Sequence, residues 1–522
     1  MRKTVAMFVL TVLFLSAGCL WAGGAKEPAP AAAPVREGRY GGILRHAYFA
    51  PTNLDPAFLS TVTDDHIARQ WTDFLVYVDE ALRPDASRSL AERWTTSADG
   101  LTWTFTLRKD VTFHNGQGFA ARDVKFTYDR LRDPSVGAAT VPLYDNVAGI
   151  SAAEDSTVVF TLKEPNPDFL MDLADYHAGI VWSGTRDFNR EQIGTGAFIV
   201  DSYVPDDRMT FKRNPNWWRK DAEGNRLPYV DGLEFIFLAE SSAQVEALRG
   251  GQVDYLIWLP QEFAKTLRAD PNVVVYEEPS NSHYVVRMRS DRPPFNDLRV
   301  RQAFRAAVDR KAILDAAIEG LGVTGRDTPI GPAYGEFYLD VPELRRDVAR
   351  ARSLLAAAGH SAGLRVTLTS QTGTAMPAIA TILKEQLAPA GVTVDIQLVP
   401  PDVYYGADNL WLEADFAITD WGPRATPQHY LALAYTCDAK WNESHWCDPE
   451  VDRLAKAAAL EGDRAKRAEI FKDIQRIFMD RGPVIIPFFN NNLWAASARL
   501  KGLVPTSYYP TSVDLKQVYF ER

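Results

Sequence analysis

The sequence contains few of the residues on which catalytic and metal-binding sites depend. Three cysteines and eight histidines occur among 522 residues, and the histidines are scattered rather than clustered. No HExxH or GxxxxGK(S/T) motif occurs, so the patterns of a zinc protease and a phosphate-binding loop are missing. We therefore expect a protein that is not an enzyme, with no catalytic residues, no metal site and no cofactor.

Positively charged residues are fewer than negatively charged ones. Acidic residues outnumber Lys and Arg by 67 to 57, which gives a formal net charge of −10. No basic stripe follows the chain, so nucleic-acid binding is not expected. The length and the 46% of hydrophobic residues suffice for two to four domains with packed cores.

One glycine motif, GLGVTG at residues 320–325, has the spacing of a dinucleotide-binding loop. Such a loop follows a strand, whereas a helical pattern precedes this one. We interpret the motif as a helix C-cap followed by a flexible loop.

The longest apolar run lies at the N-terminus. Arg2 and Lys3 precede an apolar stretch of about eleven residues from Val5 to Leu15, which suits a signal peptide and is short for a membrane span. We expect residues 1–22 to be a signal peptide. Residues 23–38, rich in Ala, Pro and Gly, are then a flexible tether.

Two cleavage sites compete in this segment. The sequence LSAGC ending at Cys19 is similar to a lipobox, although its Leu lies one place too far upstream. Cleavage there would leave Cys19 lipidated, whereas cleavage after Ala22 would discard it. We expect a periplasmic or extracytoplasmic protein anchored through Cys19, with a free periplasmic protein as the alternative.

The remaining cysteines, Cys437 and Cys447, are ten residues apart. Because an exported protein enters an oxidising compartment, we expect them to form a disulfide. Such a bond stabilises a fold by roughly 2–4 kcal/mol. Two thiols with the nearby His445 match no common zinc-ligand spacing.

Residues 364–421 alternate between strand and helix patterns. The predicted elements are strands at 364–369, 392–398 and 416–419 and a helix at 375–388. This βαβ order predicts a parallel sheet. Ligands of such sheets bind beyond the carboxyl ends of the strands, where residues 370–374 and 420–426 lie.

Four features follow one another along the chain in the order of a known family. They are Phe113–Gly116 with Ala121–Tyr128, Gly194–Phe198 with Lys212–Trp218, Pro294–Asp297 with Arg299–Ala303, and the cysteine pair. Together they resemble the family 5 extracellular solute-binding proteins, the dipeptide and oligopeptide receptors of ABC importers. The resemblance extends from about Gly41 to the C-terminus. Ala120 is a departure, because the family usually has a small hydroxyl residue there.

The resemblance implies an α/β fold of the periplasmic-binding-protein-like type II, with two lobes, a hinge and an inserted extra domain. Lobe I would comprise residues 39–55, 186–283 and 490–522, the inserted domain 56–185, and lobe II 284–489. A solute would bind between the lobes and close them. A membrane permease would then recognise the closed form.

The resemblance also implies solute-binding residues. Trp421 matches a Trp of the family's ligand loop, and its ring could stack on a solute or belong to the core. Three residues later, oligopeptide receptors have an acid that pairs with the peptide's amino terminus. Arg424 stands there instead, and would favour an anionic oxygen or pair internally with Asp415 or Asp420. Asp420 could itself bind an amine, although it precedes Trp421 by one residue instead of following it by three.

Further candidates lie near the expected cleft. They are Tyr48 and Asn281 near the hinge, Ser370, Thr372 and Thr374 at a helix start, and Tyr404 with Tyr405. Helix capping and packing are the alternative roles for these side chains.

A peptide-like solute is the expected ligand, and an ABC permease is the expected partner of a monomeric receptor. An oligosaccharide or an anionic amino-acid conjugate is an alternative ligand within the same role. A chemosensory co-receptor that reports the solute to a membrane partner is a second role that the sequence leaves open.

Overall fold

The computed structural model describes residues 39–59, 62–406, 409–508 and 512–521. The predicted signal peptide, tether and lipidation site Cys19 lie outside these ranges. No helix within the described ranges is long and apolar enough to cross a membrane.

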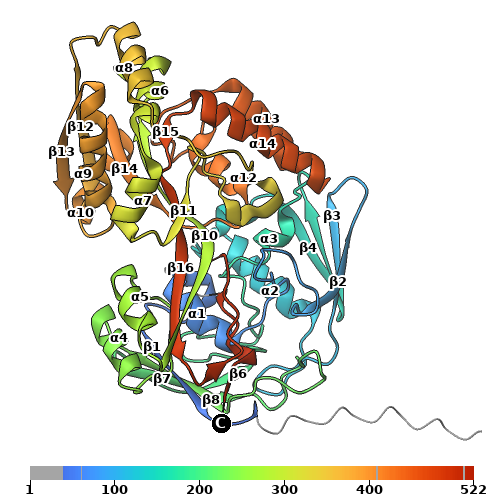
Figure 1. Cartoon of the computed structure of the whole chain (residues 1–522). Coiled ribbons are helices and arrows are strands. Elements are labelled where there is room, and N and C mark those ends of the chain that lie inside the picture. The colour runs from blue at the N-terminus through green and yellow to red at the C-terminus, as the bar shows by residue number, and fades with distance from the viewer. Residues whose placement is uncertain (1–38, 60–61, 407–408, 509–511, 522) are drawn as a thin grey trace, which may run out of the picture. The chain divides into compact units, whose positions relative to one another are not determined.

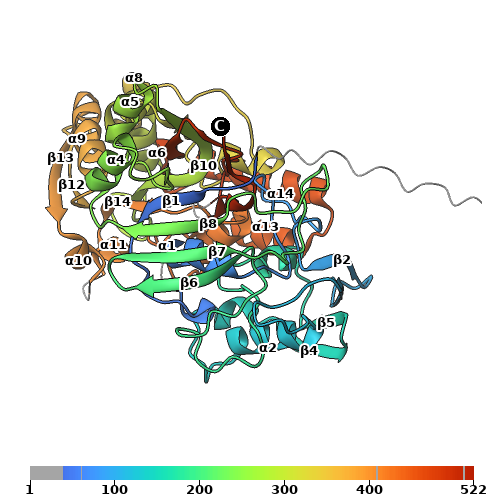
Figure 2. The same ribbon diagram turned by 90° about the horizontal axis from the view of Figure 1, so that it is seen from below.

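One mixed sheet runs through both lobes, in the strand order β13-β12-β14-β10-β16-β9-β1-β8-β7-β6. Lobe I contains β1 (Ile43–Tyr48), β6 (Phe198–Val204), β7 (Arg208–Arg213), β8 (Gly232–Phe237) and β9 (Tyr255–Leu256), with helices α4 (Ser241–Arg249) and α5 (Gln261–Arg268). Helix α1 (Val62–Trp71) packs in the same core as these strands, although it lies within the residues predicted for the inserted domain. In this lobe β1 pairs in parallel with β8 and β9. Strands β1, β8, β7 and β6 lie side by side in Figure 2.

Lobe II holds the other end of the sheet. Its strands are β11 (Gly322–Thr324), β12 (Leu364–Gln371), β13 (Val392–Val399), β14 (Phe416–Trp421) and β15 (Val484–Ile485). Its helices are α6 (Leu298–Ala307), α7 (Arg310–Ile318), α8 (Val348–Ala357), α9 (Met376–Leu387), α10 (Pro401–Tyr404), α11 (Leu410–Glu413), α12 (Pro427–Tyr430), α13 (Pro449–Leu460) and α14 (Arg464–Arg481). The predicted βαβ unit is confirmed, because β12 pairs in parallel with both β13 and β14. The apolar stripe of α9 packs on this sheet.

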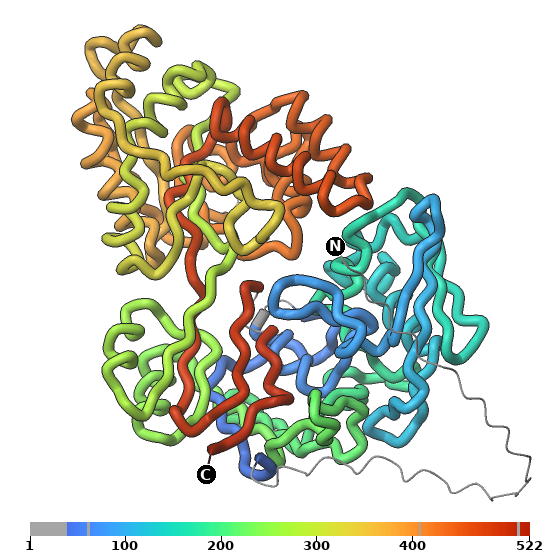
Figure 3. The backbone as a smooth tube through the Cα atoms, turned by 45° about the vertical axis from the view of Figure 1, so that its right-hand side comes forward, coloured from blue at the N-terminus to red at the C-terminus, as the bar shows by residue number. Residues whose placement is uncertain are grey.

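Two long antiparallel strands, β10 (Val273–Met288) and β16 (Phe488–Ser497), run from one lobe to the other (Figures 1 and 3). The first part of β10 pairs with β16, and its second part pairs with β14 of lobe II. Between Pro279 and His283 the register shifts, so that three residues of β10 lie opposite one of β16. Such a bulge bends the ladder, and Pro279 has no N–H to donate to it. This crossover has the features expected of a hinge.

The inserted domain has its own antiparallel sheet. Strands β2 (Ala91–Thr96), β3 (Thr102–Leu107), β5 (Thr157–Leu162) and β4 (Val147–Glu154) pair in that order, and α2 (Ala121–Arg132) and the short α3 (Phe169–Asp172) complete the domain. A separate core forms between the sheet and α2, where the Tyr128 and Phe160 rings meet edge to face at 5.3 Å.

Ala120, the departure from the family pattern, is the N-cap residue of α2. Its methyl side chain cannot accept a hydrogen bond from the first N–H groups of the helix. The Asp123 carboxylate compensates, because it accepts hydrogen bonds from the N–H groups of Ala120 and Ser183, both at 3.1 Å. These bonds satisfy part of the helix start.

The expectation of a flexible loop at residues 320–325 is wrong. Helix α7 ends at the left-handed Glu319, as the C-cap interpretation requires, but Gly322–Thr324 then forms β11 and pairs with β16. A Cβ at Gly322 would lie 2.3 Å from the Phe489 carbonyl oxygen, and one at Gly325 would lie 1.9 Å from that of Ile486. These glycines therefore allow close backbone approach beside the crossover.

Histidine burial at the crossover makes the stability of the fold dependent on pH. His283 is 1% exposed, and burial lowers its pKa to about 4. Its Nδ1 lies 2.8 Å from the Asn281 carbonyl oxygen and must donate to it. The unfolded chain therefore binds a proton between about pH 6.5 and pH 4 that folded His283 does not bind.

We predict that His283 lowers the free energy of unfolding by about 1.4 kcal/mol for each pH unit below about 6.5. Urea unfolding at several pH values between 7 and 5 measures this slope. The His283→Gln variant should lose that part of the slope, whereas other titrating groups act equally in both proteins. Identical slopes for the two proteins would contradict the prediction.

Candidate functional site

A group of aromatic and polar residues gathers where β14 ends beside the crossover. Trp421 is the last residue of β14, and its ring lies 5.8 Å from that of Tyr430 in α12. The Arg424 guanidinium lies 5.5 Å from the Trp421 ring centre and 5.9 Å from that of Tyr430. The Tyr334 hydroxyl donates to the Arg424 carbonyl oxygen at 2.8 Å. We call Trp421, Arg424, Tyr430 and Tyr334 the β14 cluster.

The β14 cluster reaches the crossover through Tyr430. The Tyr430 hydroxyl lies 2.9 Å from the Asn281 carbonyl oxygen and 2.8 Å from that of Gly422, and its ring lies 5.1 Å from the His283 ring. Asn281 is fully buried. The structure therefore places the predicted residues Trp421, Arg424 and Asn281 around one tyrosine.

A buried ion pair fixes the Trp421 ring. The Trp421 Nε1 donates to Glu443 Oε1 at 2.8 Å, and the Thr419 hydroxyl donates to Glu443 Oε2 at 2.6 Å. Arg287 Nε lies 3.2 Å from Glu443 Oε2, and both side chains are at most 1% exposed. Burial raises the pKa of Glu443, and the positive charge of Arg287 opposes this rise. The carboxylate thus has a charged partner and two donors.

The predicted disulfide is present in the structure and joins Cys437 to Cys447. Glu443 lies in the loop that this bond closes. Trp421 is itself 5% exposed and packs in the core of lobe II. The Trp421 Nε1 therefore already has a hydrogen-bond partner in Glu443. The role of the ring in stacking on a solute stays a prediction.

The two acids proposed as internal partners of Arg424 have other partners. Asp415 pairs with Arg292 at 3.2 Å, and Asp420 accepts a hydrogen bond from the Tyr405 hydroxyl at 3.0 Å. Arg424 donates to the Pro423 carbonyl oxygen at 3.2 Å.

Three of the other predicted residues are buried in the structure. They are Tyr48, Ser370 and Tyr404, and their hydroxyls donate to the carbonyl oxygens of Thr63, Gln371 and Ile418 respectively. They lie on strands and a helix whose apolar neighbours fill the cores, and their hydroxyls satisfy backbone groups there. Thr374 has the capping role, because its hydroxyl accepts the Met376 N–H at 3.2 Å. Thr372 is exposed beyond β12.

The inserted domain contacts lobe II through a second buried ion pair. Arg467 of α14 donates two hydrogen bonds to the Asp168 carboxylate, one of them 2.7 Å long, and the Thr426 hydroxyl donates a third at 3.3 Å. Nearby, His429 Nε2 lies 3.5 Å from Asp172 Oδ1. No local pattern in the sequence predicts Asp168, Arg467, Glu443 or Tyr430, because their partners are far apart along the chain.

Comparison with known proteins identifies the fold and the family. The family model "Bacterial extracellular solute-binding proteins, family 5 Middle" matches residues 86–442. The chain belongs to this family. Family 5 proteins are extracytoplasmic solute-binding proteins of ABC importers, so the predicted resemblance and the coarse role are confirmed.

The relatives are binding proteins by name. Di/tripeptide-binding protein 1 of Pseudomonas aeruginosa is 30% identical over 477 residues, which cover 83% of this chain and 86% of that protein. Glutathione-binding protein GsiB of Escherichia coli is 25% identical over 86% of this chain and 89% of its own length.

Solved structures confirm the type II fold with two lobes. HbpA2 of Haemophilus parasuis has a TM-score of 0.81 at 22% identity, over 92% of this chain and all of that one. DppA of Helicobacter pylori in complex with the peptide STSA has a TM-score of 0.73 at 23% identity, over 93% of this chain and 99% of that one. The residue limits predicted for the lobes and the inserted domain stay predictions.

We predict that Glu443→Leu lowers the free energy of unfolding by about 3–5 kcal/mol, because it leaves the buried Arg287 without its charged partner. Glu443→Gln retains an oxygen for the Trp421 N–H and should cost less. Urea unfolding monitored by tryptophan fluorescence measures both. Equal stability of wild type and Glu443→Leu would show that the pair does not support the site.

Proposed function

We propose that this protein captures a peptide-like solute between its two lobes and delivers it to a membrane permease of an ABC importer. The observation that carries the proposal is the β14 cluster, which lies at the carboxyl edge of a parallel sheet and beside the crossover strands. Ligands of open α/β sheets bind at such edges. The names of the relatives, which bind di- and tripeptides or glutathione, support a peptide-like ligand.

Arg424 defines the chemistry of this solute. The corresponding acid of the peptide receptors would attract an ammonium group, whereas a guanidinium repels it and binds a carboxylate through paired N–H donors. The aromatic rings of Trp421 and Tyr430 flank the guanidinium and lower its contact with water. We therefore propose that the solute presents a carboxylate or another anionic oxygen to Arg424.

Closure follows from the architecture. The crossover strands allow the lobes to move, and a solute that contacts both lobes stabilises the closed form by its difference in affinity for the two forms. We also propose that the exported protein is a monomer anchored through Cys19, which mass spectrometry of the membrane-bound protein tests.

Titration calorimetry with the mature chain tests the ligand class. The probes are alanyl-alanine, its carboxamide, and maltotriose. We predict that alanyl-alanine binds, that its carboxamide binds about 10- to 100-fold more weakly, and that maltotriose does not bind. Arg424→Gln should weaken alanyl-alanine binding by about 10- to 100-fold, since a hydrogen bond to a charged group contributes about 1.5–3 kcal/mol.

The matched control is Arg365→Gln, which removes an exposed arginine that pairs with Asp395 on the edge of the sheet. It should bind like wild type. Binding of maltotriose alone would contradict the peptide-like ligand. Unchanged binding by Arg424→Gln would contradict the role of Arg424 and leave the receptor role intact.

A further inference from the structure

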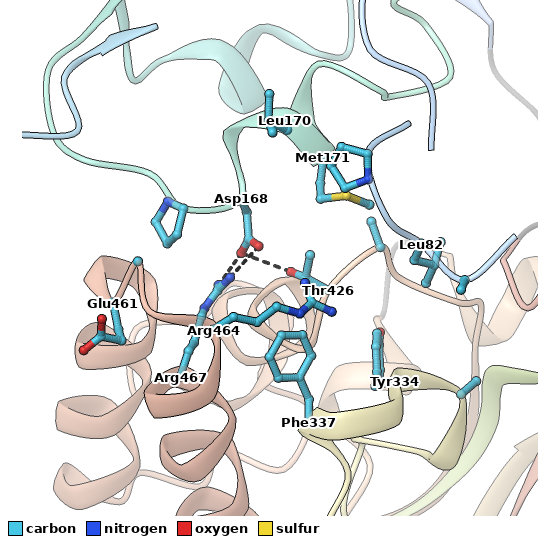
Figure 4. Close-up of a pocket in the computed structure, with 16 residues that line it drawn as sticks. Leu82, Asp168, Leu170, Met171, Tyr334, Phe337, Thr426, Glu461, Arg464 and Arg467 are labelled. Atoms are coloured by element: carbon cyan, nitrogen blue, oxygen red, sulfur yellow. Dashed lines mark hydrogen bonds and ion pairs between the residues drawn. The ribbon is translucent and has the colours of Figure 1, made fainter. Parts of the chain in front are cut away.

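A cavity of about 260 Å³ lies between the inserted domain and lobe II (Figure 4). Leu82, Leu170 and Met171 form its inserted-domain wall, and Tyr334 and Phe337 form its lobe II wall. These five side chains are large and apolar or aromatic. The centre of the cavity therefore suits an apolar group.

Four charged residues line the cavity: Asp168, Arg467, Arg464 and Glu461, whose carboxylate accepts the Asp463 N–H at 2.7 Å. Asp168 and Arg467 neutralise each other, and dashed lines join them in Figure 4. Arg464 stands at the rim with its side chain 55% exposed, pairs with Glu336, and lies 4.7 Å from the Phe337 ring centre. An occupant thus meets apolar side chains together with the charged side chains of Arg464 and Glu461.

Leu82 lines the cavity with a backbone conformation that is unfavourable for leucine. Its φ is +59°, in the left-handed region that a branched side chain rarely adopts. Nevertheless the side chain is 8% exposed and lines the cavity. Strained residues of this kind concentrate at binding sites, where the surrounding structure holds them in place.

The cavity adjoins the β14 cluster, because one member of the cluster, Tyr334, lines it. Ala425 and Thr426, the two residues that follow Arg424, line it as well. Tyr334 also donates its hydroxyl to the Arg424 carbonyl oxygen. A molecule held at Arg424 therefore has an apolar cavity as its immediate neighbour.

We propose that this cavity receives an apolar arm of the solute, such as a hydrophobic side chain or a short acyl or aryl group. The assignment to the solute rests on the proposed function, in which Arg424 holds the anionic end. Because the walls belong to the inserted domain and to lobe II, the arm contacts both. It therefore binds the docked arrangement better than a separated one and favours closure.

The test compares alanyl-phenylalanine with alanyl-alanine by titration calorimetry on the mature chain. Burial of the phenyl ring should make the first bind about 10- to 100-fold more tightly. Met171→Trp fills the cavity and should bring this ratio close to one. The control Val204→Trp adds the same side chain on the exposed face of β6 and should keep the ratio. Circular dichroism confirms that both variants fold.

A ratio near one in wild type, or a ratio that Met171→Trp leaves unchanged, overturns the proposal while alanyl-alanine binding preserves the proposed function. If neither dipeptide binds, a fluorescence titration with 8-anilinonaphthalene-1-sulfonate decides. A tenfold loss of this probe's affinity in Met171→Trp, with none in Val204→Trp, supports the cavity as a site for apolar anions even though the peptide function has failed. Equal affinity in all three proteins overturns it.

Discussion

The pairing of β10 with β16 is the constraint on which the rest of the structure depends. These strands belong to both lobes, so the ladder that stabilises each lobe also connects them. The shift of register between Pro279 and His283 interrupts that ladder at one place, and bending is easiest there. Trp421 and Arg424, the residues proposed to bind the solute, lie at or just after the end of β14, which pairs with β10 directly beyond this interruption. Movement at the crossover therefore changes the surroundings of the β14 cluster.

Two buried ion pairs have different tasks in this arrangement. Arg287 and Glu443 both belong to lobe II and hold one aromatic ring in a fixed position. Asp168 and Arg467 belong to different domains and define how the inserted domain meets lobe II. Burial makes each charge dependent on its partner. The first pair therefore makes lobe II more rigid around Trp421. The second favours one way of docking the inserted domain on lobe II.

Periodic patterns made much of the fold predictable from the sequence. The strands and the helix between residues 364 and 421 were found because alternation and helical spacing are local properties of the chain. The β11 strand was missed, because its three residues contain a glycine and no recognisable alternation. The family resemblance supplied the two lobes, which no local pattern could give.

The site was less predictable than the fold. Trp421 and Arg424 were found through the motif, but Tyr334 and Tyr430 come from segments that meet only in three dimensions. Tyr48, Ser370 and Tyr404 have residue types suited to binding, yet their hydroxyls bond to backbone carbonyls inside the cores. Residue type shows which bonds a side chain can make, and the packing around it decides which of them it makes.

The disulfide connects the site to the compartment in which the protein works. Glu443 lies in the loop between Cys437 and Cys447, and its carboxylate holds the Trp421 N–H. In a reducing cytoplasm the two thiols stay apart, and the loop has more conformations available to it. The Trp421 ring of the β14 cluster is then held less firmly than when the disulfide is formed. The disulfide thus makes the position of the Trp421 side chain depend on the redox state of the compartment.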